Sequence, residues 1–135
     1  MINYKTGEII LGDIVISPSL SRASFEAASV FSNAKKLSSN EPWVSYGVRF
    51  EQGDVSLDFQ GEKLSSIMIG FYLPDENTQG SWESWSQENE KKRKQLHDQI
   101  LKEEIGSTSR TFSWGKVGSI VDPKTCDASI FIQYE

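Results

Sequence analysis

Residues 43–73, which read WVSYGVRFEQGDVSLDFQGEKLSSIMIGFYL, decide the fold. Apolar residues alternate with polar or small ones over 43–51, which is the period-two pattern of a half-buried strand. A turn at 52–54 leads into a second alternating run at 55–60, and a turn at 61–63 leads into a third. The third run is apolar on both faces near 67–73, so we expect it in the centre of the sheet, ended by Pro74. The stretch predicts a three-stranded antiparallel meander.

The segment before the meander predicts a hairpin and a short helix. Two β-rich runs joined by Gly12-Asp13 form the hairpin over residues 8–17, ended by Pro18. Ser21 is placed to cap a short helix that follows it, with Phe25 on its buried face. Residues 33–42, NAKKLSSNEP, have the composition of a loop.

The segment after the meander predicts a long helix over residues 84–105. Ser84 and Gln87 have capping-box spacing, and Gly106 provides a stop signal. Its apolar stripe is narrow, with Trp85, Leu96 and Ile100 near one face, so most of its surface should meet water. Strands are expected within 111–115, 116–123 and 128–134. The whole chain, 1–135, thus predicts one α+β domain: a mostly antiparallel sheet of six or seven strands, one long helix in its C-terminal half and a short N-terminal helix.

Composition favours a cytoplasmic protein. The hydrophobic share of 37% suits a folded chain, and the only cysteine, Cys126, has no partner for an internal disulfide. The N-terminus has no basic leader followed by an apolar stretch, and no run reaches the ~18 apolar residues of a membrane span. We therefore expect neither an export signal nor a contact with membrane.

The charge distribution favours a basic partner over a nucleic acid. The net charge is −5, and residues 40–76 contain seven acids but only two basic residues, Arg49 and Lys63. An acidic field repels phosphate backbones and attracts cations. The alternative is that the acidity only keeps the protein in solution. The seven acids are Glu41, Glu51, Asp54, Asp58, Glu62, Asp75 and Glu76.

Residues that could carry out catalysis are sparse. The only histidine, His97, precedes Asp98, but neighbours on a helix point about 100° apart, so an exposed or packing role is expected for His97. One histidine and one distant cysteine are too few for a zinc site. The basic run 91–94 spreads around the helix and meets acids one turn away. We expect no enzyme activity, no metal and no cofactor.

Trp82 and Trp85 are the most distinctive pair. They stand at i and i+3 beside the acids Glu83, Glu88 and Glu90. Aromatic side chains surrounded by acids are typical of an interface that anchors a basic protein. They could equally hold a polar helix against the sheet.

The segments 7–25 (GEIILGDIVISPSLSRASF), 81–101 (SWESWSQENEKKRKQLHDQIL), 111–125 (TFSWGKVGSIVDPKT) and 129–135 (SIFIQYE) give the chain a family resemblance. It resembles bacterial immunity proteins encoded beside polymorphic toxins, including those of contact-dependent growth inhibition. The resemblance transfers no functional residue. It implies binding to the C-terminal domain of a cognate toxin, often a nuclease, in the cytoplasm.

Two binding hypotheses follow. In the first, the chain neutralises a basic nuclease toxin by covering its active site or a functional surface. The contact candidates are Asp75, Glu76, Trp82, Glu83, Trp85 and Glu88. In the second, the chain binds a small molecule or carbohydrate in a groove lined by Trp43, Tyr46, Trp82 and Trp114.

Overall fold

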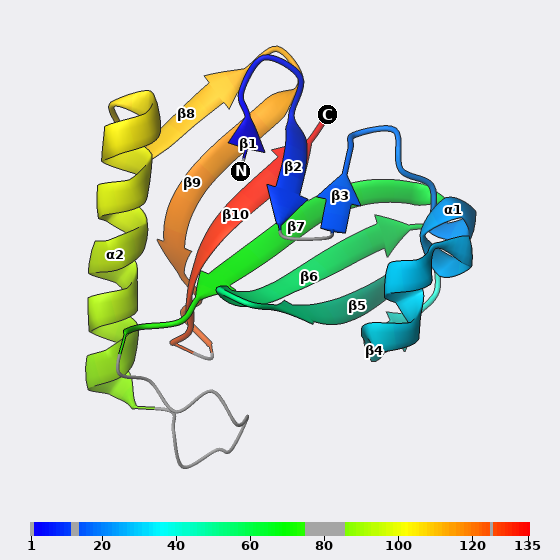
Figure 1. Cartoon of the computed structure of the whole chain (residues 1–135), viewed down its shortest axis with the longest axis horizontal. Coiled ribbons are helices and arrows are strands. Elements are labelled where there is room, and N and C mark those ends of the chain that lie inside the picture. The colour runs from blue at the N-terminus through cyan, green and yellow to red at the C-terminus, as the bar shows by residue number, and fades with distance from the viewer. Residues whose placement is uncertain (1, 12–13, 75–85, 125) are drawn as a thin grey trace.

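The computed structural model describes residues 2–11, 14–74, 86–124 and 126–135, and within them the chain is α+β, as the sequence predicted (Figure 1). A three-stranded sheet and a seven-stranded sheet are both antiparallel. The elements are β1 (Ile2–Asn3), β2 (Glu8–Leu11), β3 (Ile14–Ile16), α1 (Arg22–Ala27), the 3₁₀ helix η1 (Ser29–Asn33), β4 (Ala34–Asn40), β5 (Trp43–Phe50), β6 (Gly53–Gln60), β7 (Lys63–Phe71), α2 (Gln87–Ile105), β8 (Ser109–Phe112), β9 (Gly115–Val121) and β10 (Ala128–Tyr134).

The large sheet has the strand order β4-β5-β6-β7-β10-β9-β8, so β7 is central, as its apolar sequence predicted. The last strand, β10, lies between β7 and β9 and pairs with β7 at Ile69↔Ile130. One prediction is wrong: residues 34–40 form the edge strand β4 instead of a loop. Its side chains are mostly exposed and include two lysines, and such charged, solvated edges resist pairing with other chains.

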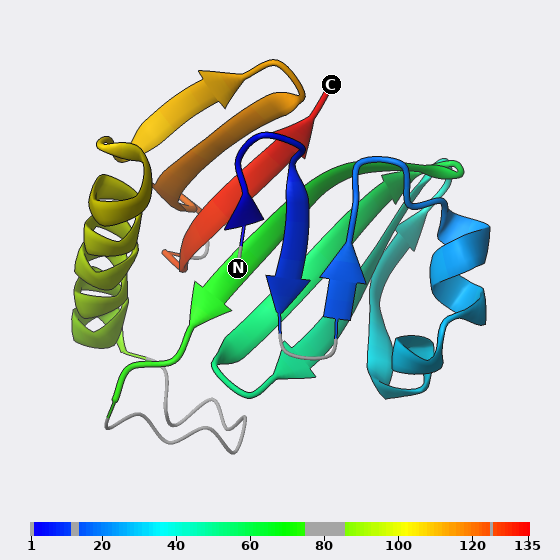
Figure 2. The ribbon, with the colours of Figure 1, turned by 45° about the horizontal axis from the view of Figure 1, so that its top comes forward.

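One face of the large sheet carries the core. Alternate side chains of β5, β6, β7 and β10 point toward it, and Leu101 of α2 joins the same cluster. The small sheet lies across this face, and α1 covers its β5–β6 end, where Phe25 packs on Tyr46 and Phe59 (Figure 2). The core includes Ile9, Leu11, Ile16, Phe25, Val44, Tyr46, Val48, Val55, Leu57, Phe59, Leu64, Ile67, Ile69, Leu101, Val117, Ile130 and Ile132.

The long helix begins later than the capping-box pattern predicted. Its N-cap is Ser86, whose side chain accepts a hydrogen bond of 3.0 Å from the Asn89 backbone N–H. Ser84 lies outside the described residues. The predicted end is confirmed, because Gly106 adopts the left-handed conformation (φ 74°) that ends many helices.

Substitutions of Ser84 and Ser86 test which serine caps the N-terminus of α2. Ser86→Ala should lower the free energy of unfolding by about 1 kcal/mol, because one N–H of the first helical turn loses its acceptor. Ser84→Ala is the matched control and should leave stability unchanged within about 0.5 kcal/mol. Urea unfolding followed by circular dichroism measures both. A larger loss in Ser84→Ala than in Ser86→Ala would restore the cap to Ser84.

Candidate functional site

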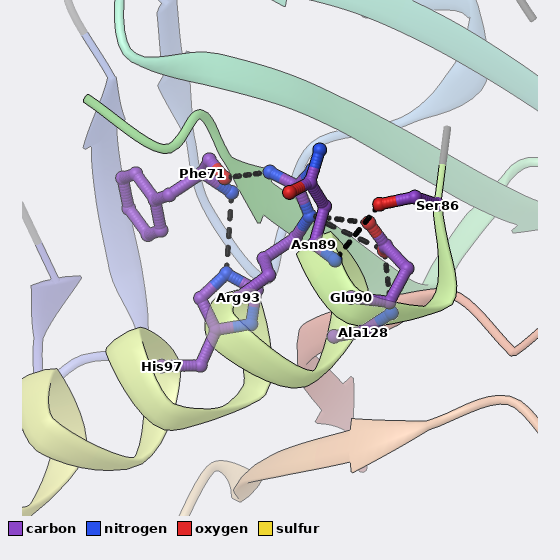
Figure 3. A network of polar contacts seen from close by, with 7 residues as sticks. All are labelled: Phe71, Ser86, Asn89, Glu90, Arg93, His97 and Ala128. Carbon is purple, nitrogen blue, oxygen red and sulfur yellow. Dashed lines mark hydrogen bonds and ion pairs between the residues drawn. The ribbon is translucent and has the colours of Figure 1, made fainter. Parts of the chain in front are cut away.

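A polar network joins α2 to the ends of β7 and β10, and we call it the polar bridge: the side chains of Glu90, Arg93 and His97 with the backbones of Phe71 and Ala128 (Figure 3). The three side chains lie on the face of α2 that is buried, together with Leu101. The inner face of this helix is therefore mainly polar, whereas the sequence indicated a narrow apolar stripe near Leu96 and Ile100, both of which are only partly buried.

The polar bridge replaces a rung that the sheet lacks. The register Ile69↔Ile130 would place Ala128 opposite Phe71, but the pairing of β7 with β10 stops before that rung. Phe71 N–H donates to Nε2 of His97 at 3.2 Å, and Phe71 C=O accepts from Arg93. Ala128 N–H donates to Glu90 at 3.0 Å. Buried backbone groups need hydrogen-bond partners. At this position side chains of α2 provide them in place of the neighbouring strand.

Charge in the polar bridge is balanced within the helix. Glu90 and Arg93 form an ion pair of 3.0 Å, and each side chain is at most about one-tenth exposed. An ion pair this buried is stable only when its remaining hydrogen-bonding positions are filled. Here the backbone groups of Phe71 and Ala128 fill them. Both residues are needed together, which makes the polar bridge a structural unit.

His97 is neutral in this setting. Its side chain is fully buried, so the sequence expectation of an exposed or packing role resolves to packing. Burial, helped by the nearby Arg93 guanidinium, lowers the pKa of His97 to about 4. Nε2 accepts a hydrogen bond from Phe71 N–H, so the ring proton lies on Nδ1, which has no partner among the described residues. Asp98 pairs with Lys94 at 2.5 Å and does not orient the imidazole.

The other face of the large sheet carries mostly small and polar side chains together with Leu37, Trp43 and Met68, and the small sheet and α1 lie over the opposite, core face (Figure 2). We use "outer face" for the part of this other face over β4–β7. On the outer face Asp58 lies opposite Ser45 on one side and Ser66 on the other. Both serine hydroxyls donate to its carboxylate, at 2.5 and 3.1 Å. Around Asp58 the outer face includes Leu37, Trp43, Ser45, Gly47, Ser56, Ser66 and Met68, and Lys35, Arg49, Asp54 and Gln60 lie on the same face.

The five described acids among those that the sequence grouped in residues 40–76 do not form one patch. Glu41 and Glu62 lie at the α1 end of the meander, where they contact Arg22 and the Ala23 backbone. Glu51 and Asp54 lie at the opposite end of the eight-residue strands β5 and β6, about 25 Å away. Asp54 is paired with Arg49 at 3.2 Å. Among the described acids of this stretch, Asp58 alone lies mid-strand, and no described cation is within 4 Å of it.

The fold has a known counterpart. A chain in the solved structure of "Rhs1-CT in complex with cognate immunity protein RhsI1" matches with a TM-score of 0.59 over 99% of this chain and 86% of that chain, at 13% sequence identity. This likeness supports, at the level of the fold, the resemblance to polymorphic-toxin immunity proteins. No family model matches the chain, and no curated protein matches it.

Most contact candidates from the sequence cannot be placed on this fold. Asp75, Glu76, Trp82, Glu83 and Trp85 lie outside the described residues, between β7 and α2 in sequence. Glu88 is exposed in the first turn of α2 and forms an ion pair with Lys92 at 3.7 Å, as its i, i+4 spacing indicated. The contact set therefore stays a prediction.

The aromatic groove of the second hypothesis is not formed by its described members. Tyr46 points into the core, whereas Trp43, three residues earlier on β5, is 45% exposed on the outer face. Trp114 packs on Phe112 and Tyr134 and donates its indole N–H to Tyr4 C=O at 2.8 Å. Trp82 lies outside the described residues. These rings face different parts of the molecule, so we do not pursue a shared carbohydrate site.

Metal and membrane sites gain no support from the described residues. No group of three or more potential metal-ligating side chains occurs among them. Within those same ranges no helix has the length and apolar character needed to cross a membrane. Cys126 lies in the turn between β9 and β10 at φ 62°, and its backbone N–H donates to Asp122 C=O at 2.7 Å.

Sequence reasoning missed two features of this site. Glu90 and Arg93 read as members of a solvated helix surface, because their partners are backbone groups of distant strands that no local pattern reveals. Asp58 was counted with the acids, and alternation already assigned it to the polar face of its strand. Only the register shows that two serines flank it.

Proposed function

We propose that this protein is an immunity protein that binds a cognate toxin domain and neutralises it. The observation that carries the proposal is the fold likeness to the Rhs1-CT and RhsI1 complex, which extends over 99% of the chain. The family resemblance of the sequence supports the same role independently. Inhibition is by binding, and we assign no catalytic step to the chain.

The partner is a basic nuclease domain at the C-terminus of a larger toxin. The net charge of −5 favours a cationic partner, since opposite charge accelerates encounter. Binding covers the active site of the toxin or a surface that it needs for activity. The contact residues are Asp75, Glu76, Trp82, Glu83, Trp85 and Glu88, in which aromatic anchors are surrounded by carboxylates.

Co-expression tests the function. The C-terminal domain of the toxin encoded beside this chain should arrest growth of a bacterial host when it is produced alone. Growth should recover when this protein is produced as well, and the two should co-purify. A toxin domain that still kills at full protein level, with no complex in solution, would reject the immunity role.

Paired tryptophan variants test the contact set. Trp82→Ala with Trp85→Ala should weaken toxin binding by about 10- to 100-fold if the rings are interface anchors, measured by titration calorimetry. Trp114→Phe is the control for loss of an indole outside this set, because Trp114 packs on Phe112 and Tyr134. The same measurement separates the two roles left open by the sequence. Unchanged affinity with a lower melting temperature would assign Trp82 and Trp85 to holding the helix on the sheet.

A further inference from the structure

We propose that the outer face binds an arginine side chain of the protein partner through Asp58. The proposal rests on the proposed function, because it names a second contact surface for the same toxin. Asp58 is the centre of this surface in the strand register: Ser45 and Ser66 lie opposite it on the two neighbouring strands. The occupant is argued from charge and from the shape of the surrounding side chains.

The Asp58 carboxylate is held in place without being neutralised. Ser45 donates to Oδ1 and Ser66 donates to Oδ2, so each oxygen accepts one hydrogen bond from a neutral hydroxyl. A carboxylate has about four lone-pair positions, and at least one on each oxygen stays open. Two parallel acceptor positions on a fixed carboxylate match the two parallel N–H donors of a guanidinium group.

Small residues give access to this carboxylate. On β5, Ser45 is followed on the same face by Gly47, and on β6 Asp58 is preceded by Ser56. None of these side chains is long enough to cover Asp58. Asp58 is therefore partly exposed, and a side chain from another molecule can reach its carboxylate.

Apolar side chains border the small residues around Asp58. Trp43 is diagonal to Asp58 across the β5–β6 pair and is 45% exposed, and Leu37 is 54% exposed and packs over Gly47. An indole beside a carboxylate can contact the flat face of a guanidinium, and aliphatic surface can receive the methylene stem of the same side chain. The border thus suits arginine better than a compact, strongly hydrated ammonium group.

Two irregularities of the sheet occur at this surface. The β4–β5 register shifts between Lys36 and Ser38, and Leu37 is the extra residue. The β6–β7 register shifts between Asp58 and Phe59, directly beside the carboxylate. Such bulges re-aim side chains and are frequent at functional sites. One bulge places Leu37 on Gly47, and the other lies directly beside Asp58.

The chain contains a close control for Asp58. Asp54 lies on the same strand and the same face, but Arg49 and the Tyr72 hydroxyl already bind its carboxylate. Asp58→Asn removes one charge and keeps groups that can bond to both serines. Asp54→Asn makes the identical chemical change where Arg49 of this chain already forms an ion pair with the carboxylate.

The experiment measures affinity for the neighbouring toxin domain by titration calorimetry at two salt concentrations. We expect Asp58→Asn to weaken binding at least about tenfold and to reduce its salt dependence, and Asp54→Asn to stay within about twofold. Trp43→Ser, a change at an exposed ring, should also weaken binding. If Asp58→Asn lowers the melting temperature, Trp43→Ser provides the decisive comparison.

The outcomes separate this proposal from the function itself. A wild-type chain that does not bind or neutralise the toxin rejects the immunity role. Wild-type binding with unchanged affinity in Asp58→Asn and Trp43→Ser rejects the outer face as a contact surface and leaves the immunity role standing. If Asp58→Asn instead converts a dimer to a monomer in sedimentation while toxin affinity holds, the outer face joins two copies of this chain and the proposal fails.

Discussion

Arg93→Met is expected to destabilise the protein by about 3 to 5 kcal/mol, because it leaves the buried Glu90 carboxylate without its cation. Glu90 keeps the Ala128 N–H as a donor, but one neutral hydrogen bond does not replace the ion pair of 3.0 Å. The substitution also removes the donor to Phe71 C=O at the end of the central strand. A loss of this size is a large part of the about 5 to 15 kcal/mol that typically stabilises a domain.

Lys92→Met is the matched control for this prediction. It also replaces a cationic side chain with methionine, one residue earlier, where Lys92 pairs with Glu88 at 3.7 Å and both side chains are more than half exposed. Exposed pairs contribute little, so the expected loss is below about 0.5 kcal/mol. Urea unfolding at neutral pH measures both variants. A loss in Arg93→Met no greater than that in Lys92→Met would show that the polar bridge is not a stabilising unit.

A double variant distinguishes the charge from the backbone contacts. Adding Glu90→Leu to Arg93→Met removes the unpaired carboxylate, so part of the stability should return. Recovery should stay incomplete, because Phe71 C=O and Ala128 N–H then both lose their side-chain partners. Full recovery would mean that these two backbone groups find other partners.

The meander could be predicted from the sequence for a physical reason. In β5 and β6 one face meets the core and the other does not, so alternation is strict and each strand is readable by itself. β4 gives no such signal, because an exposed edge strand buries almost nothing. Its composition of Lys, Ser and Asn is that of a loop, and only pairing with β5 makes it a strand.

The polar bridge could not be predicted for a different reason. Helix amphipathicity is read from apolar residues, but the inner face of α2 carries Glu90, Arg93 and His97. These residues are buried because β7 and β10 part at Phe71 and Ala128, which are distant in sequence from each other and from the helix. The position of β10 beside β7 is itself a long-range pairing. Asp58 was assigned to the right face, yet the residues that lie opposite it depend on the strand register, which shifts between Asp58 and Phe59.

His97 should make the protein less stable in mild acid. The folded state holds the pKa of His97 at about 4, whereas an unfolded histidine titrates near 6.5. Between these values the unfolded chain binds a proton that the folded chain does not, so stability falls as the pH is lowered through this window. The contribution is complete above pH ~6.5 and decreases by up to about 1.4 kcal/mol per pH unit, or about 3 kcal/mol in total, on reaching pH ~4.

The geometry gives the same sign. Protonating Nε2 would direct an N–H at the Phe71 N–H that now donates to it, and would add a positive charge near Arg93. His97→Gln is the informative variant, since its amide oxygen can accept from Phe71 N–H but does not titrate. We expect the difference in unfolding free energy between wild type and His97→Gln to change by about 3 kcal/mol between pH 7 and pH 4. Subtracting the two curves cancels the carboxylates common to both proteins.

The chain has one histidine, so its imidazole can also be followed directly by NMR without assignment. The ring signals should keep their neutral positions through pH 6.5 and begin to shift only near pH 4. The unfolding free energy should already fall between pH 6.5 and pH 4, before these signals move, because in that window only the unfolded chain binds the proton. Titration near pH 6.5 with parallel stability curves for wild type and His97→Gln would mean that His97 is accessible to solvent and does not hold β7 to α2.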